Sequence, residues 1–228
     1  MIKKILHTRT FKVTVFIFIC VVIYLSPGFS WNVKSARIEA ENHIEQQYKF
    51  KPKYISGGYS SSLDASHYLL DFVDEKNGVT FEVEVKGGQR FFIKQVKQYV
   101  ETDTYLEEML IKKMKEEISP VVKKEWEGAA AVKVDTMGHR TWEVYQEPTL
   151  NNIENLYKKD YYIAIKVKKA GTKQEESEKL FEIVKFLRSN DYLPYDIDVD
   201  FEGSNIKGIS IDNIDQINSS NDILTLMN

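Results

Sequence analysis

YLLDFVDEKNGVTFEVEV, residues 68–85, is the stretch that decides the fold of the first half of the chain. Apolar and polar residues alternate on both sides of Asn77-Gly78, as they do in a β-strand with one buried face. Asn-Gly favours the two-residue turn whose twist matches that of the flanking strands. The stretch therefore predicts an antiparallel β-hairpin.

The residues around this hairpin extend it into a larger unit. Before it, apolar residues recur at every fourth position and predict an amphipathic helix that Pro52 ends. These residues are Ala36, Ala40, Ile44 and Tyr48. After the hairpin, Gly87-Gly88 predicts a second turn and residues 91–100 predict a third strand.

A second helix closes this first unit. Thr104 and Glu107 have the spacing of a capping box, and Pro120 is expected to start a new turn or to kink the helix. The apolar positions of this helix are Leu106, Leu110, Met114 and Ile118. We therefore expect residues 31–126 to fold as a helix, three or four antiparallel strands, and a helix.

A second unit of strands and helices is expected over residues 127–228. The predicted elements are a strand at 129–134, a short helix at 150–156, a strand at 161–167, a helix after the capping box Thr172 to Glu175, and strands at 197–201 and 209–211. The Ser60-Ser61-Ser62 stretch is expected to be a loop, and the last ten residues are expected to fray.

Residues 1–30 are typical of a segment that is handed to a membrane. Four cationic residues and no acidic residue precede the apolar run from Val13 to Leu25; the cations are Lys3, Lys4, Arg9 and Lys12. The positive-inside rule then predicts a cytoplasmic amino terminus and an extracytoplasmic body. The predicted fold class is α+β: an N-terminal transmembrane helix followed by two small helix-on-sheet units.

This apolar segment has two interpretations. A spanning helix needs about 20 apolar residues, a length that the run approaches only when Phe11 and Phe29 are included. Gly28 and Ser30 place small residues behind Pro27, the pattern of a signal-peptidase site. An anchor in the cell membrane is favoured, and secretion after cleavage is the alternative.

The composition excludes several classes of partner. Of the 31 basic residues four precede residue 31, so the body carries 27 against 34 acidic residues, a net charge of −7. Such a body is not expected to bind nucleic acid, and anionic polymers and lipid headgroups are disfavoured as bulk partners. Cys20 lies in the apolar run, so the body has no cysteine for disulfides or thiolate chemistry.

Four alternating acids are the strongest candidate for a cation site: Asp196, Asp198, Asp200 and Glu202. Calcium binds closely spaced carboxylates, but an EF-hand loop needs Gly and Glu where this chain has Phe201 and Lys207. Burial of the intervening apolar residues would place the acids about 7 Å apart on one exposed strand face. We favour the exposed face, with a cation site as the alternative.

The histidines of the body, His43, His67 and His139, do not have metal-ligand spacing. His43 is expected at the boundary of the first helix. Asp64 and His67 lie near three serines and could form an acid–base pair. A catalytic triad is defined by geometry, however, so a polar loop is favoured.

Other patterns favour structural roles. Gly57-Gly58 and Gly87-Gly88 lack the residues of a phosphate-binding loop and predict turns. Three carboxylate pairs are expected on solvated helix surfaces: Glu107-Glu108, Glu116-Glu117 and Glu175-Glu176. Four aromatic residues are expected to close a sheet core rather than to bind sugar or peptide: Tyr48, Phe50, Tyr54 and Tyr59.

The first-helix pattern, the hairpin end Phe81-Glu82-Val83-Glu84-Val85 and the stretch Asp103-Thr104-Tyr105-Leu106 resemble a set of membrane-anchored proteins of Bacillus and its relatives, the YfjL-like set. The resemblance covers about half of the chain and implies a single-pass membrane protein with an exported α+β body. It implies no catalytic or binding residue.

We therefore expect a non-enzymatic, membrane-anchored protein that binds another envelope protein or peptide, without a cofactor, metal or catalytic residue. One alternative is an envelope hydrolase with a dispersed site around Asp64 and His67, or among the surface acids. The other is a calcium-stabilised secreted wall protein.

Overall fold

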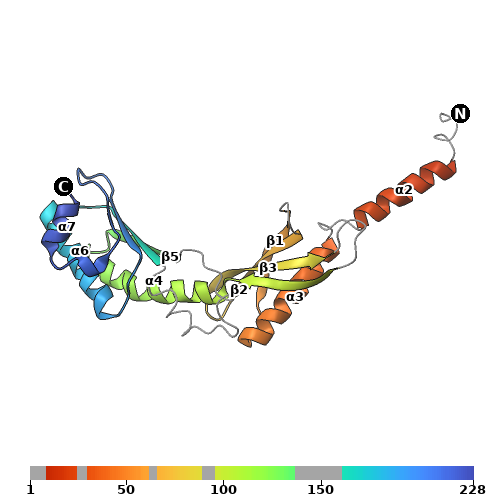
Figure 1. Cartoon of the computed structure of the whole chain (residues 1–228), viewed down its shortest axis with the longest axis horizontal. Helices are drawn as coiled ribbons and strands as arrows, with labels where there is room; N and C mark the ends of the chain where they lie inside the picture. The colour runs from red at the N-terminus through yellow and green to blue at the C-terminus, as the bar shows by residue number, and fades with distance from the viewer. Residues whose placement is uncertain (1–8, 25–29, 62–65, 89–95, 137–160) are drawn as a thin grey trace. The chain divides into compact units, whose positions relative to one another are not determined.

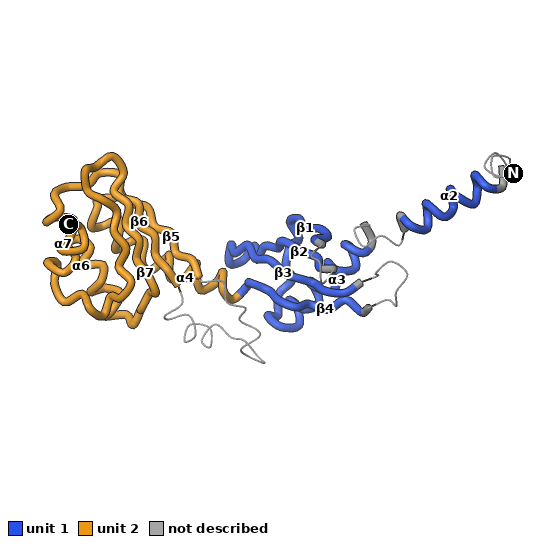
Figure 2. The backbone as a smooth tube through the Cα atoms, turned by 45° about the horizontal axis from the view of Figure 1, so that its top comes forward, with its two compact units in different colours: residues 1–105 blue, residues 106–228 orange. Residues whose placement is uncertain are grey.

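A computed structural model of the chain describes residues 9–24, 30–61, 66–88, 96–136 and 161–228. The chain divides into two compact units, residues 1–105 and 106–228 (Figure 2). Each unit contains one four-stranded sheet. The α+β class is therefore confirmed, and each unit is described by itself below.

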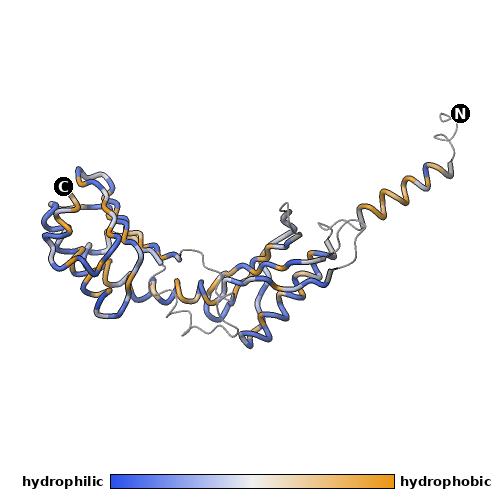
Figure 3. The backbone as a smooth tube through the Cα atoms, viewed as in Figure 1, coloured by the Kyte–Doolittle hydropathy of each residue, from blue (hydrophilic) through white to orange (hydrophobic). Residues whose placement is uncertain are grey.

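Helix α2 (Arg9–Tyr24) contains most of the apolar run. Every side chain from Phe11 to Val21 is exposed, so apolar surface surrounds the helix, which is mostly orange in Figure 3. No helix in the ranges given above is both long enough and apolar enough to span a bilayer. The transmembrane helix thus stays a prediction.

In the first unit, one helix lies along one face of an antiparallel sheet (Figure 1). The elements are α3 (Ser30–Tyr48), β1 (Lys53–Ser61), β2 (Ser66–Asp74), β3 (Val79–Gly88) and β4 (Val96–Asp103). The sheet order is β1-β2-β3-β4, with antiparallel neighbours, and α3 contacts all four strands. The part of the predicted third strand before Val96 lies outside the described residues.

The hairpin that decides this unit is confirmed. Strands β2 and β3 pair with Phe72 opposite Phe81 and Leu70 opposite Val83. These four side chains are buried, as are Ala36, Ala40 and Ile44 of α3, while Tyr48 is half-buried. The period of two in the strands and of about four in the helix therefore places both apolar faces in one core.

The two glycine pairs do not form the predicted turns. Gly57-Gly58 lies inside β1, and Gly87-Gly88 ends β3. At Gly57 φ is +142°, and an added Cβ would lie 2.4 Å from the carbonyl oxygen of Leu69 on β2. Glycine is needed here because the neighbouring strand approaches closely, a requirement that looks like a turn in the sequence. Ser60 and Ser61, predicted as a loop, also belong to β1.

The second sheet mixes parallel and antiparallel pairs. Its strands are β5 (Ala130–Thr136), β6 (Tyr161–Val167), β7 (Asp196–Phe201) and β8 (Ile209–Ile211), adjacent in that order. Only β6 and β7 are parallel, and α6 (Lys173–Ser189) connects them. The predicted capping box of α6 is confirmed, because the Thr172 hydroxyl accepts from the Glu175 backbone and the Glu175 carboxylate accepts from the Thr172 backbone.

The carboxyl end of the chain is packed rather than frayed. The short helices η2 (Ile214–Gln216) and α7 (Ser220–Leu226) contact α6. Ile223 and Met227 are buried, and the ammonium of Lys173 donates to the Met227 carbonyl at 2.8 Å. The predicted fraying is wrong because these two apolar side chains cover the core of the second unit.

Helix α4 (Tyr105–Glu125) continues through Pro120, so the predicted new turn does not occur. Five residues at intervals of four form its buried stripe: Leu106, Leu110, Met114, Ile118 and Val122. The two units divide after Tyr105, which places this helix in the second unit, whereas the sequence suggested a boundary at residue 126. The predicted short helix at 150–156 lies outside the described residues.

The predicted capping box at the start of α4 does not form. The Thr104 hydroxyl accepts a hydrogen bond from the backbone N–H of Glu82 at 3.0 Å. The Glu107 carboxylate instead accepts from the hydroxyl of Thr136. Both partners are distant in sequence, so tertiary contacts replace the local ones that the spacing suggests.

Candidate functional site

A buried carboxylate joins α3 to the end of β4 in the first unit. Asp103 accepts hydrogen bonds from the Tyr48 hydroxyl at 2.9 Å and from the backbone N–H of Tyr105 at 3.2 Å. The Nε2 of His43 lies 3.0 Å from its second oxygen. His43 thus occupies the boundary position that the sequence predicts, with a carboxylate as its partner rather than a metal or a nucleophile.

A second carboxylate, Asp74, continues this network. It accepts from the Tyr105 hydroxyl at 2.8 Å and from the side-chain amide of Asn77 at 2.7 Å. Burial alone would raise the pKa of Asp74, but these hydrogen bonds outweigh it and hold the pKa below its ordinary value. Burial and the bond to Asp74 raise the pKa of Tyr105 to about 12. Asp74 is therefore ionised and Tyr105 neutral at physiological pH, which suits structural support and not proton transfer.

The predicted aromatic residues are half-buried, and they pack against buried rings at the edge of the core. Tyr105 lies 4.8 Å from Tyr48 and 4.9 Å from Phe50, measured between ring centroids. The two later rings of the aromatic stretch also pack inward, Tyr54 on Phe72 at 5.7 Å and Tyr59 on Tyr68 at 5.6 Å. These rings contact one another and are not arranged as a platform for a ligand.

His67 lies on the face of the first sheet opposite to the one that α3 covers. It stands across from Ser60 of β1, and its Nδ1 is 3.3 Å from a carboxylate oxygen of Glu84 on β3. Asp64, Ser62 and His139 lie outside the described residues, so the suggested Asp64–His67 pair stays a prediction.

A cluster of carboxylates in the second unit differs from the sequence expectation. Glu107 is only 9% exposed, although the sequence places it on a solvated helix surface. Burial, with the nearby charges of Glu108 and Asp135, raises its pKa to about 7. The expectation is wrong because Glu107 precedes the buried stripe residue Leu110 by three positions and so shares its face of α4.

The partners of this cluster lie on β5 and β6. Asp135 accepts from the ammonium of Lys133 at 2.6 Å and from the hydroxyl of Tyr162 at 3.0 Å. Burial tends to raise the pKa of Asp135, but these two hydrogen bonds lower it overall. Glu107 and Asp135 therefore have opposite pKa shifts, which is the usual property of an acid–base site. Each carboxylate is nevertheless held by side chains of its own unit, Glu107 by Thr136 and Asp135 by Lys133 and Tyr162.

Glu176 is the second carboxylate whose burial the sequence does not predict. It is fully buried and accepts from the indole N–H of Trp126 at 2.5 Å and from the backbone N–H of Gly171 at 2.7 Å. Lys179 completes the site with an ion pair at 2.9 Å. The site is fully satisfied and joins α6 to the end of α4, so its role is structural.

The four alternating acids lie as the favoured interpretation predicts. Ile197, Val199 and Phe201 point into the core, and Asp198 and Asp200 are exposed. Within the described residues, no group of three or more acidic, histidine or cysteine side chains could hold a metal ion.

Searches of protein-family models, curated proteins and solved structures found no match to this chain. The resemblance to the YfjL-like set therefore stays a prediction, and function is inferred from the chain's own residues.

Proposed function

We propose that the chain is a single-pass membrane protein whose extracytoplasmic α+β units bind another protein or peptide of the cell envelope. The observation that carries the proposal is the apolar surface of α2. Phe16 is 67% exposed and Phe18 59%, and neighbouring aliphatic side chains are about half exposed. A helix that is apolar on every side requires an apolar environment.

The free energy available from covering this surface is large. Burial of one large apolar side chain contributes about 1.5–3 kcal/mol, and α2 exposes eight of them. They are Phe11, Val13, Val15, Phe16, Ile17, Phe18, Ile19 and Val21. The total, on the order of 10 kcal/mol or more, is enough for stable insertion, and the apolar run continues in sequence to Leu25. The cations before the run support a cytoplasmic amino terminus.

A binding role is supported by the way in which the described polar groups are used. Asp103, Asp74 and Glu176 are each satisfied by internal hydrogen bonds, which builds rigid units and leaves these groups no free position for a substrate. Both sheets also keep one face free of the helices described here, a surface on which a protein or peptide could dock.

The anchor is tested by topology and extraction. A phosphatase that is active only outside the cytoplasm, fused to the carboxyl end through a flexible linker, should be active, and the protein should stay in the membrane pellet after a carbonate wash. Replacing Phe16 and Phe18 with Lys should release the protein from the pellet, because each charge in a spanning helix costs roughly 2.5–3.5 kcal/mol.

The matched control is Tyr99→Lys, at an exposed aromatic residue of β4. An inactive fusion, or equal extraction of wild type and the double Lys variant, would contradict the anchor. A mature chain that starts near residue 31, found by mass spectrometry, would favour the secreted alternative.

The binding role needs its own experiment. The tagged full chain, cross-linked in cells, should enrich envelope proteins that are not enriched by residues 1–30 fused to an unrelated exported domain. Identical neighbours for both baits would refute a binding function of the two units.

A further inference from the structure

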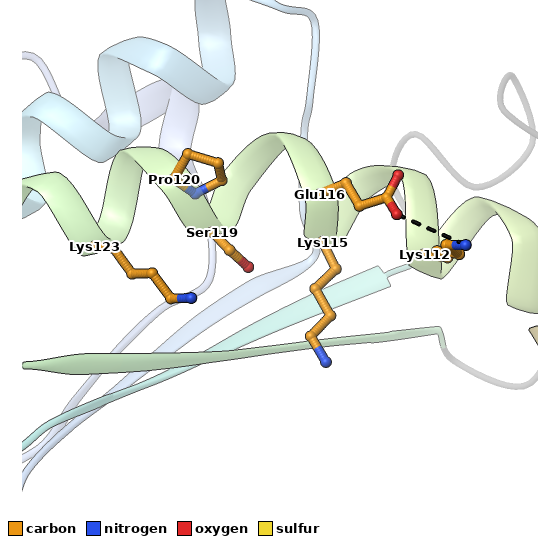
Figure 4. A pocket seen from close by; sticks show the side chains of 6 residues that line it. All are labelled: Lys112, Lys115, Glu116, Ser119, Pro120 and Lys123. Carbon is orange, nitrogen blue, oxygen red and sulfur yellow. Dashed lines mark ion pairs between the residues drawn. The ribbon is translucent and has the colours of Figure 1, made fainter. Parts of the chain in front are cut away.

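Helix α4 has a basic face beside its buried stripe. Lys112, Lys115, Ser119 and Lys123 follow one another at intervals of three or four residues and therefore share one side of the helix. With Glu116 and Pro120 they line a hollow of about 510 Å³. Figure 4 shows that Lys115, Ser119 and Lys123 project to the same side of the helix.

Two of these lysines have no carboxylate partner among the residues that the structure describes. Other lysines are paired, such as Lys133 with Asp135 at 2.6 Å and Lys179 with Glu176 at 2.9 Å. In the residues that the structure describes, no carboxylate lies within 4 Å of the ammonium of Lys115 or Lys123. Within the described residues, two cations thus lie close together without a carboxylate partner, although the chain as a whole has more acidic than basic residues.

The two acids of α4 that directly follow Lys115 have other partners. Glu116 forms an ion pair with Lys112 at 3.8 Å, and Glu117 accepts a hydrogen bond from the hydroxyl of Tyr192. The charges of Lys115 and Lys123 are therefore available to a ligand. Pro120 also has no N–H to donate to the carbonyl of Glu116, so the regular helix surface is interrupted at the hollow.

The spacing of the three groups fits an anion with several oxygens. Ser119 lies about 6 Å along the helix axis from Lys115 on one side and from Lys123 on the other. Two ammonium groups on flexible stems can converge above the hydroxyl, which can donate a third hydrogen bond. We propose that Lys115, Ser119 and Lys123 form a binding site for a phosphate group.

The chemistry favours phosphate over a carboxylate. Free phosphate or a phosphate monoester carries close to two negative charges at pH 7, which matches two ammonium groups, while a carboxylate carries one. The net negative charge of the body does not oppose this site strongly, because salt screens charges beyond roughly 8–10 Å. The site goes beyond the proposed function and exists whether or not α2 crosses a membrane.

The test uses the full chain in a neutral detergent and follows its backbone amides by NMR. The probes are inorganic phosphate and glycerophosphoglycerol, titrated at constant ionic strength with chloride. Saturable shifts of the α4 amides with either probe support the site. A preference for inorganic phosphate indicates the free ion, and a preference for the diester indicates a lipid headgroup or a phosphodiester polymer.

The variants separate a specific site from a general charge effect. Lys115→Gln with Lys123→Gln should weaken binding about tenfold or more, and Ser119→Ala roughly threefold. The matched control is Lys168→Gln with Lys169→Gln, which removes the same charge from two exposed lysines between β6 and α6 and should bind as wild type does. All of these positions are at the surface, and unchanged amide spectra would show that the variants fold.

Two results would overturn the proposal. One is a lack of saturable shifts on α4 up to about 50 mM of both probes, a level at which even weak binding is visible. The other is equal affinity for the wild type and the Lys115/Lys123 double variant.

Discussion

Replacing Glu107 with Gln should make the protein more stable at alkaline pH. The carboxyl is buried at the start of α4, where it accepts from Thr136 and lies near the charges of Glu108 and Asp135. Gln keeps the shape and the carbonyl acceptor for the Thr136 hydroxyl, but it is never charged. The variant therefore removes only the cost of ionising this position.

The sign of the pH dependence follows from the two pKa values. The pKa of Glu107 is about 7 in the folded protein and near the ordinary value of 4.5 when unfolded. Between these values the folded protein holds a proton that the unfolded chain releases. The contribution of protonated Glu107 to the free energy of unfolding is thus fully present below pH 4.5. It decreases as pH rises toward 7 and is absent above that value.

The difference between the folded and unfolded pKa values of Glu107 corresponds to ~3 kcal/mol in the free energy of unfolding. We expect about 1.5–3 kcal/mol, because Glu108 and Asp135 are partly exposed and their charges are screened by salt. Other acids of the chain titrate too, so the informative quantity is the difference between variant and wild type at each pH.

The assay is urea unfolding of the full chain in a neutral detergent, followed by tryptophan fluorescence from pH 4.5 to 8. Glu107→Gln should match the wild type at the acidic end and exceed it at pH 8. Glu127→Gln, at an exposed carboxylate just after α4, is the matched control and should follow the wild type throughout. A difference between Glu107→Gln and wild type that does not change with pH would refute the reasoning.

Three further substitutions test the packing by urea unfolding. Gly57→Ala should destabilise the protein by more than about 1 kcal/mol because its Cβ meets the Leu69 carbonyl, whereas a Cβ at Gly58 meets nothing within 4 Å; equal effects at the two positions would contradict this. Asp103→Asn should cost about 1.5–3 kcal/mol because it weakens the hydrogen bonds to His43 and Tyr48. The matched control, Asp198→Asn at an exposed position, should cost less than about 0.5 kcal/mol. Trp126→Phe should cost about 1–3 kcal/mol because it leaves buried Glu176 without its indole donor. A double-mutant cycle with Glu176→Gln should give a coupling energy of at least about 0.5 kcal/mol. Additive effects of the two substitutions would show that this hydrogen bond does not stabilise the fold.

The sequence predicts well those elements whose signal is local. Asn77-Gly78 between alternating residues specifies the β2–β3 hairpin, and Thr172 with Glu175 specifies the start of α6. In both cases the turn or cap and the apolar period agree, so local and long-range preferences point to the same structure.

The sequence fails where a partner distant in the chain decides the outcome. Glu107 has the spacing of a capping residue, but Thr136 on β5 is its partner. Gly57 looks like a turn residue, but it lies in β1 because β2 passes close to it. Glu176 looks like a surface acid until Trp126 and Gly171 are seen to donate to it. None of these partners can be paired by spacing alone.

The candidate phosphate site was missed for a related reason. Lys115 and Lys123 look like ordinary solvated lysines, and the signal that could have identified them is the absence of an acid at the helical spacing between them, where Ser119 stands. Only the structure shows that Glu116 and Glu117, the two acids that follow Lys115, have partners other than Lys115 and Lys123.

The packing of α7 has a consequence for the order in which the chain matures. Ile223 and Met227 leave the ribosome after all four strands of the second sheet, yet both fill the interior of the second unit. That unit therefore remains unfinished until α7 has been synthesised, whereas the α3 and β1–β4 layer can fold while later residues are still emerging. A nascent chain stalled before residue 223 would carry one folded unit and one with an open core.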